Sequence, residues 1–134
     1  MSFLGVDIGT TGVRAAVYDR TGRKLAICSE AYGCDVRPGG HVESDAEGWW
    51  AATMSTCAAL AAAVPMRDVE GVGVVGQAPT AVLVDSEGRA IRPAILWLDV
   101  RASDEALAIG RKLGPGRAEA LGGNRLHPYY LVPP

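Results

Sequence analysis

The chain has 134 residues, 49% hydrophobic and 21% charged, which indicates one globular domain and excludes intrinsic disorder. Its 13 basic and 15 acidic residues give a net charge of -2, so no nucleic-acid partner is expected. We expect no membrane partner and a cytoplasmic location, because there is no long apolar run, no signal-peptide pattern and no Cys-x-x-Cys pair among the 3 cysteines.

The Gly-Thr-Thr-Gly segment at residues 9–12 is the most informative stretch. Apolar residues before it, and residues 13–18 after it, predict two strands joined by a tight turn. Such a turn directs backbone N–H groups and two threonine hydroxyls at one spot, which suits a phosphate. A carboxylate beside a phosphate needs a cation between them, so we expect Asp7 to hold Mg²⁺, and Arg14 to add positive charge. The alternative is a plain hairpin whose threonines satisfy only their own turn.

A meander and a long helix are expected next. Residues 24–32 alternate as a third antiparallel strand does, and residues 37–40 have the composition of a loop. A helix is expected to begin near Ser44, which has capping-box spacing to Glu47, and to end at Pro65. Helical spacing predicts one apolar face on this helix, made of Trp50, Met54, Cys57, Ala61 and Val64.

Residues 69–76 are almost continuously apolar, which is typical of a strand buried on both faces of a parallel sheet. Ligands bind beyond the carboxyl ends of such strands, so Gln77 either belongs to a site or only ends the strand. Further along, residues 85–88 predict a hairpin turn between apolar runs at 81–84 and 90–91. A helix capped by Asp99 or Ser103, a short helix over residues 117–121, and a tail without periodicity complete the chain.

This order of elements is that of half an actin-like, ribonuclease-H-like ATPase lobe. Residues 5–14, 74–77 and 92–102, with the acidic helix start and tryptophan pair at 44–50, resemble the FGGY carbohydrate kinases, and xylulokinases among them. The resemblance extends over almost the whole chain. It implies an α/β fold with a mixed sheet and flanking helices, in which residues 1–134 form the amino-terminal portion of the first lobe and the second lobe is absent.

The resemblance also implies transfer of the ATP γ-phosphoryl group to a hydroxyl of a sugar or polyol, with ATP and Mg²⁺ as cofactors. The implied cofactor-binding residues are Asp7, which is also the metal ligand, Thr10, Thr11 and Arg14. The implied substrate-binding residues are Gln77, Ala78, Pro79, Thr80, Trp97 and Asp99. For three residues an alternative stays open: Trp97 as a core residue, Asp99 as a helix cap, and Arg101 as a surface ion pair.

Two departures limit the expectation, one at residues 78–80 and one in the tail at 127–130, which departs from the family's usual Gly-containing segment. Xylulokinases follow the glutamine with Met-His-Gly and glycerol kinases have Arg-Glu there, whereas this chain has Ala78-Pro79-Thr80, so neither substrate is assigned.

The family's general base and most of its adenosine pocket lie further along the chain, so we expect no catalytic residue here, with Asp99 left open, and an inactive fragment. A non-catalytic nucleotide- or sugar-binding module of the same fold, and a structural domain, are the alternatives. Apolar surface left uncovered predicts self-association, for example as a homodimer. The tail at 127–130 receives no role.

Overall fold

The computed structural model describes residues 1–123 and 127–128, and the chain forms two compact units. The first unit contains residues 1–33 and 46–77, and the second contains residues 34–45 and those from 78 onward. Each unit is described by itself below. Along the described residues, no helix combines the length and the apolar character that a membrane span requires.

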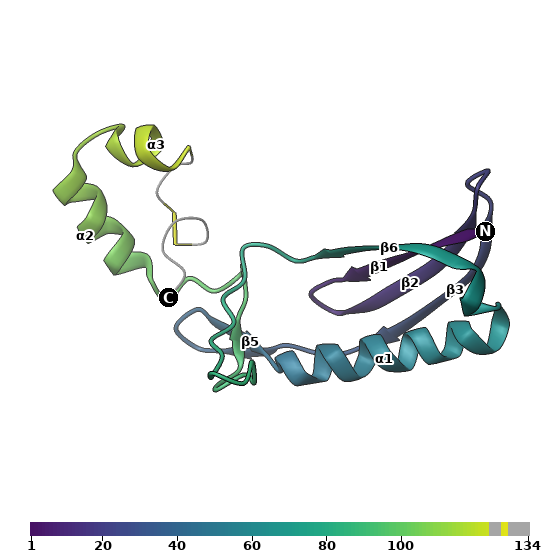
Figure 1. Cartoon of the computed structure of the whole chain (residues 1–134). Coiled ribbons are helices and arrows are strands. Elements are labelled where there is room, and N and C mark those ends of the chain that lie inside the picture. The colour runs from purple at the N-terminus through teal and green to yellow at the C-terminus, as the bar shows by residue number, and fades with distance from the viewer. Residues whose placement is uncertain (124–126, 129–134) are drawn as a thin grey trace. The chain divides into compact units, whose positions relative to one another are not determined.

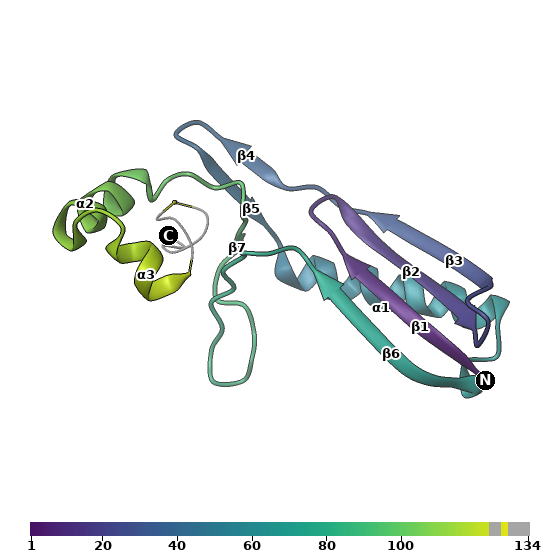
Figure 2. The ribbon, with the colours of Figure 1, turned by 90° about the horizontal axis from the view of Figure 1, so that it is seen from above.

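The first unit is a four-stranded mixed sheet with one long helix on one face (Figure 1). Figure 2 shows the strands side by side in the order β3-β2-β1-β6. The antiparallel part is β1 (Ser2–Ile8), β2 (Gly12–Asp19) and β3 (Lys24–Ala31), and β6 (Val69–Gly76) runs parallel to β1. The predicted hairpin, third strand and parallel crossover strand are therefore confirmed. The crossover is made by α1 (Ala46–Ala63) and a short 3-10 helix, η1 (Met66–Asp68).

The core of this unit lies between α1 and the sheet. Alternate residues of β1 and β2 point at the helix, as the pleat requires, and contribute Leu4, Val6, Val13, Ala15 and Val17. The helix buries the row Ala52, Thr56 and Leu60 against them. The predicted apolar face of the helix is wrong in part: Cys57 and Val64 do contact the core, but Trp50 and Met54 are 64% and 50% exposed and Ala61 is exposed. Small side chains at 52 and 56 let the helix backbone approach the sheet, which the bulky residues would prevent.

The first unit corrects the predicted burial of β6 and agrees with the predicted start of the long helix. Strand β6 is parallel, as predicted, but it is an edge strand of the described sheet and Val72, Val74 and Val75 are each more than 60% exposed. The reason is that α1 packs mainly on β2 and β3 and leaves β6 uncovered. Helix α1 begins at Ala46, shortly after the end of β5 at Ser44, so the predicted start near Ser44 is confirmed.

The second unit carries a small antiparallel sheet and two helices. The sheet has the order β4 (Asp35–Arg37), β5 (His41–Ser44) and β7 (Ala94–Ile95), and the helices are α2 (Ser103–Leu113) and α3 (Arg117–Gly122). The loop expected at 37–40 is the tip of the β4–β5 hairpin, whose two short strands the sequence did not predict.

The later predictions in the second unit have mixed outcomes. Both helices are confirmed, and Gly123 ends α3 in the left-handed conformation. The predicted cap of α2 is wrong, because Ala102 precedes the helix and no side chain caps it. Around residues 85–88 the chain does turn back, but the flanking runs share only an isolated bridge between Val84 and Ala90. The predicted tail, apart from His127 and Pro128, lies outside the described residues.

Candidate functional site

The turn that joins β1 to β2 is held in shape by the end of β3. Within the turn, Gly9 N donates to the Gly12 carbonyl at 2.9 Å. Tyr32, just after β3, donates its backbone N–H to Thr11 O at 3.0 Å and its hydroxyl to Gly9 O at 2.5 Å. Burial, and the negative charge of Asp7, raise the pKa of the Tyr32 hydroxyl, so it stays a proton donor at neutral pH. The sequence did not single out Tyr32 as a site residue. The signal that could have found it is the pairing of the third strand with the second, which places Tyr32 beside the turn.

Gln77 ties the carboxyl end of β6 to the same turn. Its backbone N–H donates to Ile8 O at 3.1 Å, and its side-chain Nε2 donates to Gly9 O at 3.3 Å. The Thr10 hydroxyl donates to Gln77 Oε1 at 3.0 Å. The structure therefore brings Gln77 and Thr10 together as partners that order the turn, while the expected roles of Thr10 at a phosphate and Gln77 at a sugar stay predictions.

A cavity of about 370 Å³ lies beside the turn and is lined by Asp7, Thr11 and Arg14. Asp7 and Arg14 are direct partners in the antiparallel register of β1 and β2, so the fold itself sets their proximity. The donor set fits a metal-bound polyphosphate: a carboxylate suits a hydrated divalent cation, and a hydroxyl and a guanidinium suit phosphate oxygens. Ser29, the register partner of Arg14 on β3, also lines the cavity and was missed from sequence.

The described residues offer too few ligands to hold a metal ion by themselves, so a bound nucleotide would have to supply the others. No group of three or more His, Cys, Asp or Glu residues gathers within residues 1–123 and 127–128. Mg²⁺ is commonly held by one or two carboxylates together with phosphate oxygens and water. Asp7 alone therefore fits a cation that arrives with a nucleotide, and does not fit a resident metal cage.

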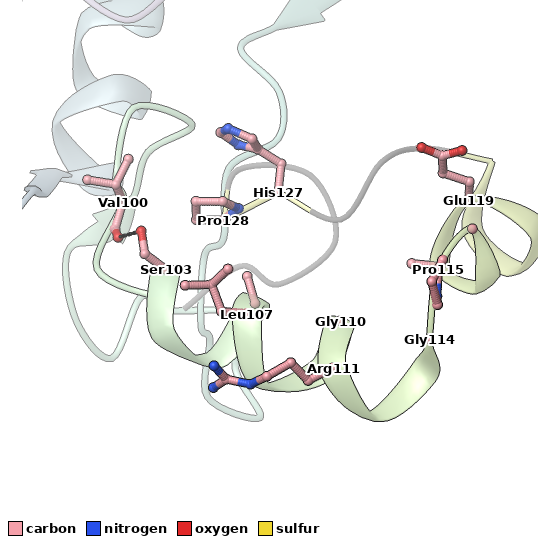
Figure 3. A pocket seen from close by; sticks show the side chains of 13 residues that line it. Val100, Ser103, Leu107, Gly110, Arg111, Gly114, Pro115, Glu119, His127 and Pro128 are labelled. Carbon is pink, nitrogen blue, oxygen red and sulfur yellow. Dashed lines mark hydrogen bonds between the residues drawn. The ribbon is translucent and has the colours of Figure 1, made fainter.

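The second unit contains a larger cavity, of about 1030 Å³, between α2 and α3 (Figure 3). Its walls include Val100, Leu107, Gly110 and Pro128, and His127 lines it too. None of the predicted site residues lines this cavity, and its wall is mainly apolar. It therefore adds no candidate for the chemistry that the sequence predicts.

Trp97 stands on a tight turn that is tied at both ends to one residue of β5. Asp99 N donates to Leu96 O at 2.9 Å and closes the turn. Leu96 N donates to Val42 O at 3.0 Å, and Val42 N donates to Asp99 Oδ2 at 2.7 Å. Leu96 is buried while Trp97 is 39% exposed. Trp97 is thus presented at the surface of this unit, and the alternative of a core residue does not hold for the described part of the chain.

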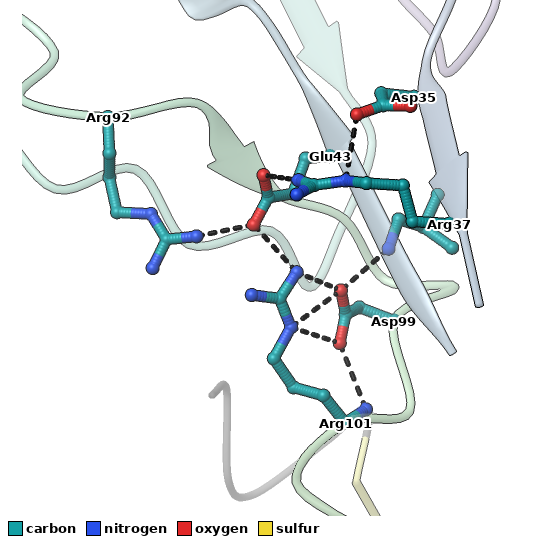
Figure 4. Close-up of polar contacts among 7 residues, drawn as sticks. Asp35, Arg37, Glu43, Arg92, Asp99 and Arg101 are labelled. Atoms are coloured by element: carbon teal, nitrogen blue, oxygen red, sulfur yellow. Dashed lines mark hydrogen bonds and ion pairs between the residues drawn. The ribbon is translucent and has the colours of Figure 1, made fainter. Parts of the chain in front are cut away.

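Asp99 is almost completely buried, and both of its oxygens accept several hydrogen bonds (Figure 4). Arg101 provides its backbone N–H at 3.0 Å, Nε at 2.8 Å and Nη2 at 2.6 Å, and Val42 provides the fourth donor. Burial raises the pKa of the Asp99 carboxyl, but these donors outweigh it and hold the pKa below its ordinary value. A buried, ionised and fully bonded carboxylate is a poor general base, so its expected contact with a sugar hydroxyl stays a prediction without support from this geometry.

Arg101 is not the surface ion pair that one interpretation of the sequence held. Its side chain is 18% exposed, and it contacts both Asp99 and Glu43. Bonds to these two carboxylates raise the pKa of the guanidinium above its ordinary value. Glu43, which sequence reasoning missed, therefore joins the set of residues around the Trp97 turn.

Residues 78–80 lead out of β6 by a cis peptide bond between Ala78 and Pro79. Ala78 is exposed, Pro79 and Thr80 are half-buried, and the Thr80 hydroxyl oxygen is itself buried. Within the described residues this hydroxyl has no hydrogen-bond partner. A buried polar atom usually has a partner, so Thr80 has capacity for a ligand or for another part of the protein.

Comparisons with known proteins agree with the geometry. The model of the FGGY family of carbohydrate kinases, N-terminal domain, matches residues 2–133. A xylulose kinase of Klebsiella pneumoniae is 34% identical over 131 residues, which are 98% of this chain and 27% of that protein. Glycerol kinase 1 of Pseudomonas aeruginosa is 30% identical over 95% of this chain and 26% of its own length. The crystal structure of a xyloylose kinase from Brucella ovis has a TM-score of 0.89 at 32% identity and covers 99% of this chain and 28% of its own. The predicted ribonuclease-H-like α/β fold is thereby confirmed.

Proposed function

This chain belongs to the FGGY family of carbohydrate kinases, and we propose that its protein transfers the γ-phosphoryl group of ATP to a hydroxyl of a sugar or polyol. The names of the similar proteins, xylulose kinase and glycerol kinase, support this class of reaction. The chain spans only about a quarter of the length of these relatives. We therefore propose further that residues 1–134 are the amino-terminal portion of the first lobe.

The observation that carries the proposal is the cavity where Asp7, Thr11 and Arg14 meet. When bound, Mg²⁺ supplies positive charge to the phosphate oxygens. The carboxylate of Asp7 would hold the hydrated cation, and Thr11 and Arg14 would bind phosphate oxygens. Phosphoryl transfer depends mostly on positioning and charge neutralisation, so a turn fixed by Tyr32 and Gln77 is suited to it.

The sugar side of the proposal depends on the second unit. The exposed ring of Trp97 offers a flat apolar surface for one face of a sugar, and Thr80 offers a hydroxyl with bonding capacity. Within the described residues, Asp99 is too fully bonded to act as the base. We therefore propose that the base lies outside these residues and that they are inactive alone. Ketoses and polyols are the substrates to screen first.

Two minor proposals accompany this one. The cysteines Cys28, Cys34 and Cys57 are free, which suits the reducing conditions of the cytoplasm. Apolar side chains on the outer face of the sheet, such as Ile27 at 49% exposure, give a surface for self-association, for example as a homodimer. Light scattering that shows a monomer at high concentration would contradict the second of these.

The test is a coupled assay of ADP release by the whole kinase with Mg-ATP and a panel of ketoses and polyols. Asp7→Asn and Thr11→Val should each lower turnover, by about 10²-fold or more for Asp7, because Asp7 would hold the cation that neutralises the phosphate charge and Thr11 would bind a phosphate oxygen. Asp104→Asn, which changes an exposed carboxylate on α2, is the matched control and should leave turnover unchanged. Unchanged kinetics for both turn variants would refute the assignment, and binding of Mg-ATP without turnover would favour a non-catalytic module.

A further inference from the structure

The Trp97 turn is tied to its unit by polar contacts, while Trp97 and Leu98 at its tip are 39% and 40% exposed. Both ends of the turn bind Val42 on β5, and the carboxylate of Asp99 is one of the two connections. Whatever holds Asp99 in place therefore also holds the turn that carries Trp97.

Asp99 is in turn fixed by Arg101, and Arg101 is fixed by Glu43. The Arg101 Nη2 atom lies 2.6 Å from Asp99 Oδ2 and 2.7 Å from Glu43 Oε1, so one nitrogen joins the two carboxylates. Glu43 is the residue next to Val42 on β5, and it is 4% exposed. Strand β5 thus holds the turn at two points: through the backbone of Val42, and through the contacts of Glu43 with Arg101 and of Arg101 with Asp99.

Glu43 forms ion pairs with two further arginines besides Arg101. Arg37 binds its Oε2, and Arg92 binds the same Oε1 as Arg101 (Figure 4). Burial raises the pKa of the Glu43 carboxyl, but Arg101, Arg37 and Arg92 outweigh burial and lower it. Glu43 is therefore a fixed negative charge that holds three arginines, and two of them, Arg92 and Arg101, lie 49 and 58 positions further along the chain.

We propose that Glu43 is a positioning residue of the sugar site, which acts through Arg101 and Asp99 to fix the turn that presents Trp97. This inference rests on the proposed function, because it takes Trp97 as the surface on which the sugar lies. Glu43 is buried beneath these contacts and does not itself reach the substrate. Loss of its charge leaves Arg101 with one carboxylate, so its guanidinium gains freedom and the turn loosens while the strand stays paired.

The first measurement follows Trp97 directly and needs no substrate. In chain 1–134 with Trp49→Phe and Trp50→Phe, Trp97 is the single tryptophan. Glu43→Gln should lower the fluorescence anisotropy of Trp97 and increase its quenching by acrylamide. Arg101→Lys, which keeps the charge but loses the planar fork, should do the same. Glu87→Gln, which changes an exposed glutamate paired with Arg89, is the matched control and should change neither signal. Far-UV circular dichroism confirms that each variant is folded.

The second measurement separates positioning from general stability. In the whole kinase, Glu43→Gln should raise the KM for the sugar about tenfold, leave kcat within about twofold and leave the KM for Mg-ATP unchanged. Unchanged Trp97 signals in both Glu43→Gln and Arg101→Lys overturn the inference. So does an unchanged sugar KM in Glu43→Gln when Trp97→Ala raises that KM. If Trp97→Ala itself leaves the sugar KM unchanged, the assignment of Trp97 in the proposed function fails, while the fluorescence data still decide whether Glu43 holds the turn.

Discussion

Replacing Asp99 by asparagine tests whether buried charge holds the Trp97 turn. The substitution keeps the size and shape of the side chain but removes its charge and one acceptor. On the Oδ1 side the donors are Arg101 N and Nε, and on the Oδ2 side they are Val42 N and Arg101 Nη2. Whichever way the amide turns, its NH₂ group meets two donors and the hydrogen bonds on that side are lost.

The cost follows from burial and from the number of donors. Hydrogen bonds to a charged group contribute about 1.5–3 kcal/mol each, and removal of one partner from a buried ion pair costs about 3–5 kcal/mol. Arg101 keeps Glu43 as a partner, which places the expected loss at the lower end, about 3 kcal/mol. With a urea m-value of about 2 kcal/mol/M, the unfolding midpoint of the second unit should fall by about 1.5 M.

The assay is urea unfolding of the chain that retains Trp97 as its single tryptophan, followed by fluorescence. Asp85→Asn is the matched control, because Asp85 accepts from the N–H groups of Glu87 and Arg89 and from Arg89 Nε, but at the exposed surface. Water can replace those bonds, so its midpoint should change little. If Asp99→Asn shifts the midpoint no more than Asp85→Asn does, then burial of the carboxylate does not stabilise the turn.

Two further predictions concern the turn at residues 9–12 and stability at acid pH. Gly12→Ala should destabilise the first unit by about 1–3 kcal/mol and weaken Mg-ATP binding, because a Cβ there would lie 2.6 Å from the backbone oxygen of Glu30. The control is Gly5→Ala, since a Cβ at Gly5 would meet open space. Equal unfolding midpoints for the two variants would refute the steric argument. The folded chain lowers the pKa values of Glu43 and Asp99, so on acidification these carboxylates take up protons more readily in the unfolded chain than in the folded one. Their contribution to stability is therefore complete above their unfolded pKa of about 4. It is lost as the pH falls through their lower pKa values in the folded chain. Acid unfolding followed by Trp97 fluorescence should therefore depend less on pH in Asp99→Asn than in the unchanged chain, and an identical dependence would contradict this origin.

The phosphate side of the candidate site was accessible from sequence because its members are neighbours along the chain. Asp7 and Arg14 lie on two strands joined by a four-residue turn, so a correct hairpin prediction already makes them register partners. Thr11 belongs to that turn. Only local signals were needed: two glycines, flanking apolar runs and a carboxylate at the end of the first strand.

Burial was predicted less well, because burial depends on which surfaces meet. The helical period of α1 was correct, but the face that contacts the sheet is the one with small residues, Ala52 and Thr56, and not the one with Trp50 and Met54. Likewise, the apolar sequence of β6 correctly indicated a parallel strand. Its exposure follows from the position of α1 across the sheet, which no pattern within residues 69–76 encodes.

The contacts around Trp97 were missed from sequence, although Asp99 and Arg101 were both named, because the residues that make them are remote along the chain. Glu43 and Arg101 are 58 positions apart, and Val42 and Asp99 are 57 positions apart. From sequence, Asp99 had three interpretations: a helix cap, an acceptor of sugar hydroxyls and, left open, a general base. The structure shows that it does not cap α2 and that its bonding capacity is spent on Val42 and Arg101. If the proposed sugar site is correct, contacts from the described residues would therefore come from groups other than Asp99, such as the exposed part of the Trp97 ring and the hydroxyl of Thr80.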